Sequence, residues 1–221
     1  MYGDHGGDWV TETSGLRAPR LATRVAAEKE WLGLVADGRP VGHVFRLAGI
    51  YGPGRSAIDT VRRGAAQVAR DDVTEAPDAV PLEVAPDATL PEATAPEATV
   101  PEVQWVSRIH VDDIGRGLLA SAARPYVGPR DLPGAAVYNV ADDQPAPRGQ
   151  VLDAAAALLG ERCGAPGPLR YRDPGRPSGR PRAGGRENKR VGAARLREVG
   201  WAPWYTNYEE GLRAILDEEE S

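Results

Sequence analysis

The sequence predicts an α/β fold with a largely parallel sheet. Three short apolar segments, at 41–47, 106–110 and 137–140, have the composition of buried strands. Segments with helical spacing stand before, between and after them. Strands that alternate with helices are typical of sheets whose strands run parallel. Because only three convincing strands are found, we expect the sheet to be incomplete.

The first helix is predicted over 19–37. Pro19 suits a first helical turn, where its missing N–H group would have no partner. An apolar stripe at helical spacing follows, formed by Leu21, Val25, Leu32 and Val35. Gly38 is typical of the residue that follows a helix.

The middle of the chain contains two more predicted helices and a loop. Residues 49–55 (GIYGPGR) are expected to form a turn-rich loop, and a helix is predicted over 58–68. Asp112 or Asp113 is expected to cap the next helix, because aspartate accepts hydrogen bonds from free N–H groups at helix starts.

The C-terminal part is predicted to be mostly helical. Three helices are expected there, at 148–159, 189–198 and 208–216. A Gly-, Pro- and Arg-rich loop over 164–186 separates the first two. Trp201 and Trp204 are expected to pack the end of the chain on the sheet, since large aromatic side chains mostly fill cores.

Residues 71–104 are predicted to form a disordered, acidic, low-complexity insert. Prolines recur there at a constant spacing of five, at positions 81, 86, 91, 96 and 101. Proline at this frequency prevents a helix. The segment contains nine acidic residues and no Lys or Arg. Such a composition buries too little apolar surface to fold. A surface insertion is the simplest interpretation, and a binding segment is the alternative.

Composition narrows the classes of function. The chain has 221 residues, a net charge of −5 and a single cysteine, Cys163, which excludes an intrachain disulfide and a cysteine-based zinc site. No metal site is predicted. No apolar run approaches the roughly 20 residues of a membrane helix, and no signal peptide is visible. We therefore expect a soluble, cytoplasmic protein without a membrane partner. The basic segment 172–190 has no interleaved aromatics, so nucleic acid is not an expected partner.

Five short motifs identify a family resemblance by their order. They are Tyr2-Gly3-Asp4, the RLAGIYGPG segment at 46–54, IHVDD at 109–113, VYNV at 137–140, and a closing pattern from Asn188 through Gly200-Trp201-Ala202-Pro203 to Gly211-Leu212. In this order they resemble the extended short-chain dehydrogenase/reductase superfamily, in its NAD-dependent epimerase/dehydratase branch. The resemblance covers nearly all of the chain outside 71–103, and it matches the C-terminal portion of that family.

The resemblance implies the domain organisation. Residues 1–70 would form the second half of a Rossmann-type sheet domain, interrupted by the 71–104 insert. Residues 105–163 would supply the remaining strands and helices. Residues 164–221 would form a small C-terminal substrate region.

The resemblance also implies site residues. The residues expected beside an NAD or NADP cofactor are Arg24, Leu47, Ala48, Gly49 and Ile50. Arg55 and His110 are expected to contact substrate. For Arg55 the alternative is a solvated surface arginine. For His110 the alternative is a structural histidine bonded to the backbone.

Two features of the family have no counterpart in the sequence. The glycine-rich turn that holds the cofactor pyrophosphate would precede Met1. Arg20 and Arg24 stand where the family has its Tyr-x-x-x-Lys pair. An arginine does not give up its proton at accessible pH, so it cannot replace the base. Catalytic residues are therefore not assigned, and the chain alone is expected to bind NAD(P) poorly and to be inactive.

Two functions follow as hypotheses. The chain is part of an NAD(P)-dependent epimerase/dehydratase- or reductase-like oxidoreductase that acts on a nucleotide-sugar or a similar polar small molecule. Alternatively, it is a non-catalytic ligand- or protein-binding relative with the same fold. A homodimer is compatible with either hypothesis.

Overall fold

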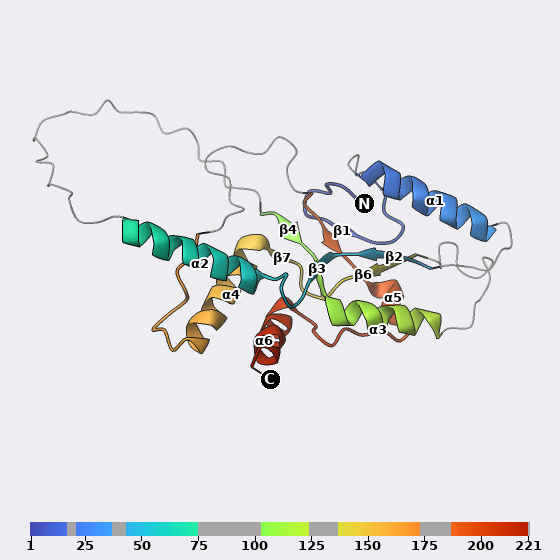
Figure 1. Cartoon of the computed structure of the whole chain (residues 1–221). Helices are drawn as coiled ribbons and strands as arrows, with labels where there is room; N and C mark the ends of the chain where they lie inside the picture. The colour runs from blue at the N-terminus through green and yellow to red at the C-terminus, as the bar shows by residue number, and fades with distance from the viewer. Residues whose placement is uncertain (17–20, 37–42, 75–102, 124–136, 173–186, 221) are drawn as a thin grey trace, which may run out of the picture.

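The computed structural model describes residues 1–16, 21–36, 43–74, 103–123, 137–172 and 187–220 (Figure 1). Residues 75–102 of the predicted insert lie outside the described residues, as do Pro19, Arg20 and Gly38. The described part is α/β, as predicted. Its sheet is incomplete, because the strands in these ranges form four separate two-stranded sheets instead of one continuous sheet. None of the described helices is long and apolar enough to cross a membrane.

The central strand pair is parallel. Strand β2 (Val44–Leu47) pairs with β6 (Val137–Val140), with Phe45 opposite Tyr138 and Leu47 opposite Val140. All four residues of β6 are buried. These two strands correspond to the segments predicted at 41–47 and 137–140. The burial expected for a strand inside a parallel sheet holds for β6, whereas β2 is only partly buried and Leu47 at its end is exposed.

The chain changes partners directly after β2. The Ala48 N–H donates to Val140 O, and the next N–H, of Gly49, donates to Ser107 O, each at 3.0 Å. Strand β3 (Gly49–Tyr51) then pairs in parallel with β5 (Arg108–His110). The predicted loop over 49–55 is thus wrong at its start, because pairing with a distant strand overrides the local turn signals.

Two short pairs join segments that lie far apart in the sequence. Strand β1 (Trp9–Val10) runs parallel to β8 (Arg190–Val191), and β4 (Trp105–Val106) runs antiparallel to β7 (Ala146–Pro147). The helix predicted from 189 is wrong at its start, since 190–191 is a strand. This strand is held to β1 by a hydrogen bond that the Arg190 N–H donates to Asp8 O at 2.9 Å. Only the end of that segment is helical, as α5 (Ala194–Glu198).

The described residues include five longer helices: α1 (Ala22–Ala36), α2 (Ala57–Thr74), α3 (Val111–Ala122), α4 (Arg148–Arg162) and α6 (Tyr208–Glu218). Each covers a segment that was predicted to be helical. Helix α2 reaches Thr74, beyond its predicted end at 68 and into the start of the predicted insert.

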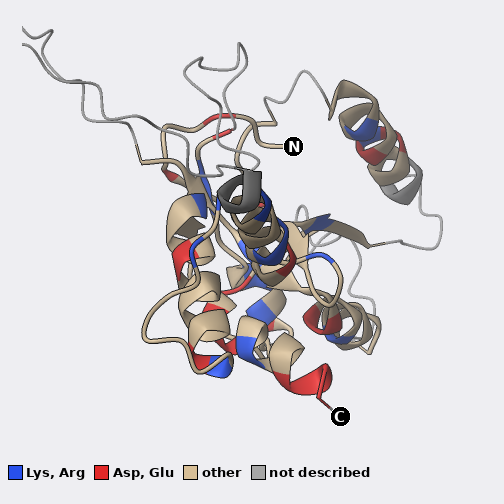
Figure 2. Cartoon of the chain, turned by 60° about the vertical axis from the view of Figure 1, so that its left-hand side comes forward, with Lys and Arg blue, Asp and Glu red and all other residues tan. Residues whose placement is uncertain are grey.

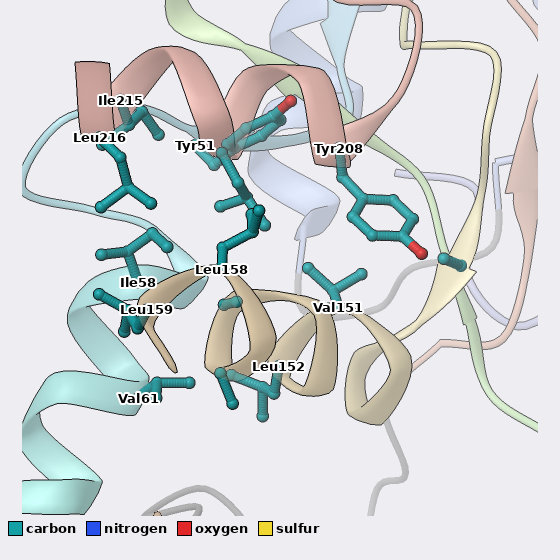
Figure 3. Packing of buried hydrophobic residues seen from close by; sticks show 14 residues of the cluster. Tyr51, Ile58, Val61, Val151, Leu152, Leu158, Leu159, Tyr208, Ile215 and Leu216 are labelled. Atoms are coloured by element: carbon teal, nitrogen blue, oxygen red, sulfur yellow. The ribbon is translucent and has the colours of Figure 1, made fainter. Parts of the chain in front are cut away.

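Helices α2, α4 and α6 pack together around one core. Figure 3 shows side chains of all three pointing toward one another: Ile58, Val61, Leu152, Leu159, Ile215 and Leu216. At the edge of this core, Arg62 of α2 pairs with Glu219, and Arg162 of α4 pairs with Glu220 and Asp217. The acidic end of α6 is visible beside the C-terminus in Figure 2. These ion pairs are exposed and add little to stability, so the apolar core holds the helices together.

A second core joins the N-terminal segment and residues 191–201 to the strands. It contains Tyr2, Ile109, Val140, Leu196 and Trp201 among its buried members. Trp201 packs as predicted, and its indole N–H donates to Asp113 O at 3.2 Å. The prediction for Trp204 is wrong. This side chain is 63% exposed and stacks with the Arg116 guanidinium, whose carbon lies 4.1 Å from the ring centroid.

Helix α1 is packed least. Among its described side chains only Glu28 is buried, and Trp31 is largely exposed. Figure 1 shows the helix set apart from the other helices, beside β2. The apolar stripe predicted for this segment therefore has few partners among the described residues.

Candidate functional site

All five residues predicted to lie beside a cofactor line one cavity. It has a volume of about 530 Å³ and lies at the carboxyl end of β2. Leu47, Ala48, Gly49 and Ile50 form a continuous wall, and Arg24 reaches the cavity from the first turn of α1. The carboxyl ends of parallel strands are where open α/β sheets bind ligands. We call this space the β2 cavity. Contact of these residues with NAD(P) remains a prediction.

The wall combines apolar surface with nearby cations. Leu47 and Ile50 are 40% and 38% exposed, which is high for large aliphatic side chains. Lys189 also lines the cavity, where its ammonium pairs with Glu187 and donates to Gly3 O at 3.1 Å. A flat apolar ring with an anionic substituent would complement such a wall.

Gly49 is favoured by the close approach of its neighbours. A Cβ atom at this position would lie 3.2 Å from Ser107 O, because β3 and β5 begin their pairing there. The glycine of the RLAGIYGPG segment thus permits the change of strand partner that shapes the wall.

Arg46 lines the β2 cavity and binds several neighbouring groups. Its guanidinium forms a two-pronged ion pair with Glu28 of α1 and donates to Tyr2 Oη at 2.8 Å and to Glu12 O at 3.0 Å. Burial alone would lower the pKa of Arg46, but the hydrogen bonds to Glu28 and Tyr2 raise it above the usual value. Arg46 is therefore a fixed charge that positions α1.

The two tyrosines near the site are buried. The Tyr2 hydroxyl donates to Asn139 Oδ1 and accepts from Arg46, and burial raises its pKa. Burial raises the pKa of Tyr51 far above the usual value, and the Asp142 carboxylate adds to this shift. Neither phenol is therefore suited to proton exchange near neutral pH.

His110 is buried and is not among the residues that line the β2 cavity. Only 1% of its surface is exposed, and its ring contacts Tyr51 and Tyr205, with centroids 5.1 and 4.4 Å away. Its Nδ1 accepts from Asp112 N at 3.4 Å, which caps α3. The predicted aspartate cap of this helix is thus wrong, because His110 occupies the capping position. The predicted contact of His110 with substrate is not tested by this geometry.

The buried Asp113 has a different role from capping. Its carboxylate accepts from Trp204 N at 2.6 Å and from Tyr205 N at 3.2 Å, and so fixes the segment before α6. The sequence signal for this role was weak, because both aspartates of the IHVDD motif are equally suited to a helix start.

A second cavity of about 640 Å³ adjoins the β2 cavity along Gly49, Ile50, Arg55 and Val106. It extends between α2, β5, α4 and the start of α6. Four arginines line it: Arg55, Arg63, Arg108 and Arg148. We call it the arginine cavity. Arg55 was predicted as a substrate contact, whereas the other three arginines carry no motif and were missed.

No group of three or more metal-binding side chains occurs among the described residues. Arg24 stands at the position of the family's lysine and lines the β2 cavity, whereas Arg20 lies outside the described ranges. What the described geometry offers is a ligand cavity with an apolar wall and fixed cations.

Comparisons with known proteins agree with the fold. No protein-family model and no curated protein matches the chain. Among solved structures, a functionally unknown conserved protein from Silicibacter pomeroyi is 34% identical, with a TM-score of 0.60; the match covers 100% of this chain and 64% of that one.

Two enzymes of known activity are similar in fold. UDP-glucose 4-epimerase from Thermus thermophilus, in complex with NAD, is 18% identical with a TM-score of 0.58, and the match covers 100% of this chain and 60% of the enzyme. dTDP-glucose 4,6-dehydratase from Bacillus anthracis, also with NAD, is 17% identical with a TM-score of 0.61; the match covers 99% of this chain and 58% of the enzyme. The chain therefore spans less than two thirds of the length of these three structures.

Proposed function

The chain has the fold of the extended short-chain dehydrogenases/reductases that its motifs resemble, and on this premise we propose that it forms one wall of an NAD(P) site in an epimerase/dehydratase-like protein. One observation carries the proposal. Arg24 and the segment from Leu47 to Ile50, which the motifs assign to the cofactor, gather around a single cavity at the carboxyl end of β2.

The chemistry of the wall suits the nicotinamide half of the cofactor. The exposed faces of Leu47 and Ile50 would cover an apolar ring and keep water from it. Arg24 would lie within reach of a ribose or phosphate, for which a guanidinium is a good donor. NAD(P), when bound, would supply a nicotinamide that accepts or donates hydride.

The substrate class follows by analogy. The Thermus enzyme acts on UDP-glucose and the Bacillus enzyme on dTDP-glucose, and both are nucleotide sugars. We propose that the complete protein takes a nucleotide-sugar or a similar polar small molecule, beside Arg55 at the junction of the two cavities. This assignment of the substrate class rests on fold analogy.

The described residues of the β2 cavity are not expected to catalyse the reaction by themselves. An arginine in place of the lysine cannot act as a base, and the pKa values of Tyr2 and Tyr51 are raised by burial. The described residues of the β2 cavity thus bind and orient a ligand, and they offer no phenol–lysine pair for proton transfer.

Saturation-transfer difference NMR with NAD tests the proposal, because it detects weak binding and reports which ligand protons touch the protein. We expect larger saturation of the nicotinamide protons than of the adenine protons. Leu47→Asp should abolish the signal, because it places a charge on the apolar wall. Leu119→Asp, at a residue that is 72% exposed on α3, is the matched control and should preserve it. Stronger saturation of adenine, or equal loss in both variants, would contradict the proposal.

The second candidate function is non-catalytic ligand or protein binding by the same fold. It is favoured by the arginine at the lysine position, because Arg24 retains a place in the cavity while it cannot serve as the base. Incubation of the chain with NAD and UDP-glucose, followed by product analysis, tests it. Any turnover that Arg24→Gln removes would rule this candidate out.

A further inference from the structure

Three buried residues carry polar atoms that no other described protein group satisfies. Across the described ranges, the buried side-chain nitrogen and oxygen atoms without a hydrogen-bond partner are Tyr51 Oη, His110 Nε2 and both carboxylate oxygens of Asp142. Less than a tenth of the surface of each residue is exposed. Buried polar groups almost always have a partner, so four such atoms on three residues need an explanation.

The three residues are neighbours in the fold. Tyr51 lies opposite His110 in the pairing of β3 with β5, and their rings meet edge to face with centroids 5.1 Å apart. The Asp142 N–H donates to Arg108 O on β5 at 2.8 Å. After burial, the Asp142 carboxylate is the largest cause of the raised pKa of Tyr51. Because charge effects weaken with distance, the carboxylate lies near the phenol.

The unpaired atoms are complementary in chemistry. His110 Nδ1 accepts from the Asp112 N–H, so the neutral ring carries its proton on Nε2. Nε2 and the Tyr51 hydroxyl are then two donors, and the Asp142 carboxylate offers two acceptor oxygens. None of these donors bonds either acceptor directly. A group that satisfies all four atoms must therefore accept two hydrogen bonds and donate two.

The surroundings of these atoms favour a small group. The Tyr51 hydroxyl packs on the backbone of α6, where a Cβ atom at Gly211 would overlap it, and Figure 3 shows the tyrosine ring against this helix. Tyr51 belongs to the core of α2, α4 and α6, whereas Ile109 and Ala141, next to the other two residues, belong to the second core. The polar atoms thus lie at the boundary between the two cores.

We propose that one buried water molecule bridges Tyr51, His110 and Asp142 and so joins the two cores. Water accepts two hydrogen bonds and donates two, which matches the two donors and the two acceptor oxygens. An ammonium ion only donates, and it would leave the protons of His110 and Tyr51 without an acceptor. This water site requires neither NAD(P) nor a substrate, so it goes beyond the proposed function.

Magnetic relaxation dispersion of water ¹⁷O tests the site, because it counts the water molecules that stay in a protein long enough to tumble with it. At pH 8, where the Asp142 carboxylate is mostly charged, Tyr51→Phe should hold one long-lived water fewer per chain than the original sequence. Tyr208→Phe is the matched control. This phenol lies in the same core, but its hydroxyl accepts from Gln150 at 3.1 Å, so the variant should keep the original count.

Urea unfolding adds a second measurement whose sign is informative. Tyr51→Phe should raise the equilibrium constant of unfolding by about fivefold or more, because it removes a buried hydrogen bond. If the hydroxyl had no partner in solution, its removal would instead raise the urea midpoint, since an unpaired buried group destabilises the fold.

Four results would overturn the water site. They are an original chain without a long-lived water, an unchanged count in Tyr51→Phe, the same loss of a water in Tyr208→Phe, and a raised urea midpoint for Tyr51→Phe. A loss of stability with an unchanged count would mean that Tyr51 bonds Asp142 directly. None of these results affects the nicotinamide experiment, which depends on Leu47.

Discussion

Arg46 and Glu28 form a buried ion pair that joins β2 to α1. Both side chains are almost fully shielded, and Glu28 is the only buried side chain among the described residues of α1. The helix that carries Arg24 to the β2 cavity is thus attached to β2 mainly through one charged contact, whereas most helices are attached by an apolar face.

Glu28→Gln should release α1. The substitution leaves the buried Arg46 without its counter-charge, and breaking such a pair costs about 3 kcal/mol of unfolding free energy. Hydrogen exchange should accelerate in 22–36 before the rest of the chain is affected. Glu30→Gln, at an exposed position of the same helix, should cost less than about 0.5 kcal/mol. Equal urea midpoints for both variants would show that the pair does not hold the helix.

Gly211→Ala should destabilise the contact between α6 and β3. A Cβ atom at Gly211 would overlap the Tyr51 hydroxyl, and the ring has no free space because it packs against His110. Overpacking of this kind costs about 1–3 kcal/mol. Gly115→Ala on α3, where nothing lies within 4 Å, should instead stabilise the chain by up to about 1 kcal/mol through helix propensity. Thermal unfolding of both variants measures the contrast, and a neutral Gly211→Ala would contradict the packing.

Asp142 should make the chain less stable as the pH rises. Burial raises its pKa from 3.8 to about 7. At a pH between these two values, the carboxyl group therefore keeps its proton in the folded state and has lost it in the unfolded state. Stability therefore falls as the pH rises from about 4 to about 7, by up to about 4 kcal/mol. Asp142→Asn should remove this fall, so that the variant gains more stability over the original chain at pH 8 than at pH 5.

Asp143→Asn provides the control for this pH dependence. Asp143 is the neighbouring residue, but it is exposed and pairs with Arg197. Its substitution should leave the pH dependence of the urea midpoint nearly unchanged. If Asp142→Asn retains the same pH dependence as the original chain, the Asp142 carboxyl is not the source of that dependence and the prediction is wrong.

The alternation of helices and strands could be predicted because its signals are local. The strands at 44–47 and 137–140 are apolar and β-branched, and each long helix shows helical spacing, helical length or a capping residue in its own sequence. The pairing of β1 with β8 could not be predicted. Each strand has only two residues, and about 180 residues separate them. Nothing in either segment indicates its partner.

The part of the candidate site that lies at the end of β2 could be predicted from the sequence. The segment from Leu47 to Ile50 could be placed because ligands gather where parallel strands end, and Arg24 because a motif position identified it. The arginine cavity was not predictable, since Arg63, Arg108 and Arg148 come from three elements without a common spacing. An arginine inside the short apolar strand at 106–110 was the one available signal.

We expect the β2 cavity to receive the nicotinamide half of NAD(P). Titration of the ¹⁵N-labelled chain with NAD, followed by amide chemical shifts, measures this contact. Saturable shifts are expected at Leu47, Ala48, Gly49 and Ile50 and at the start of α1, which together line the cavity. Shifts confined to α4 and α6, or no shifts at millimolar NAD, would contradict it.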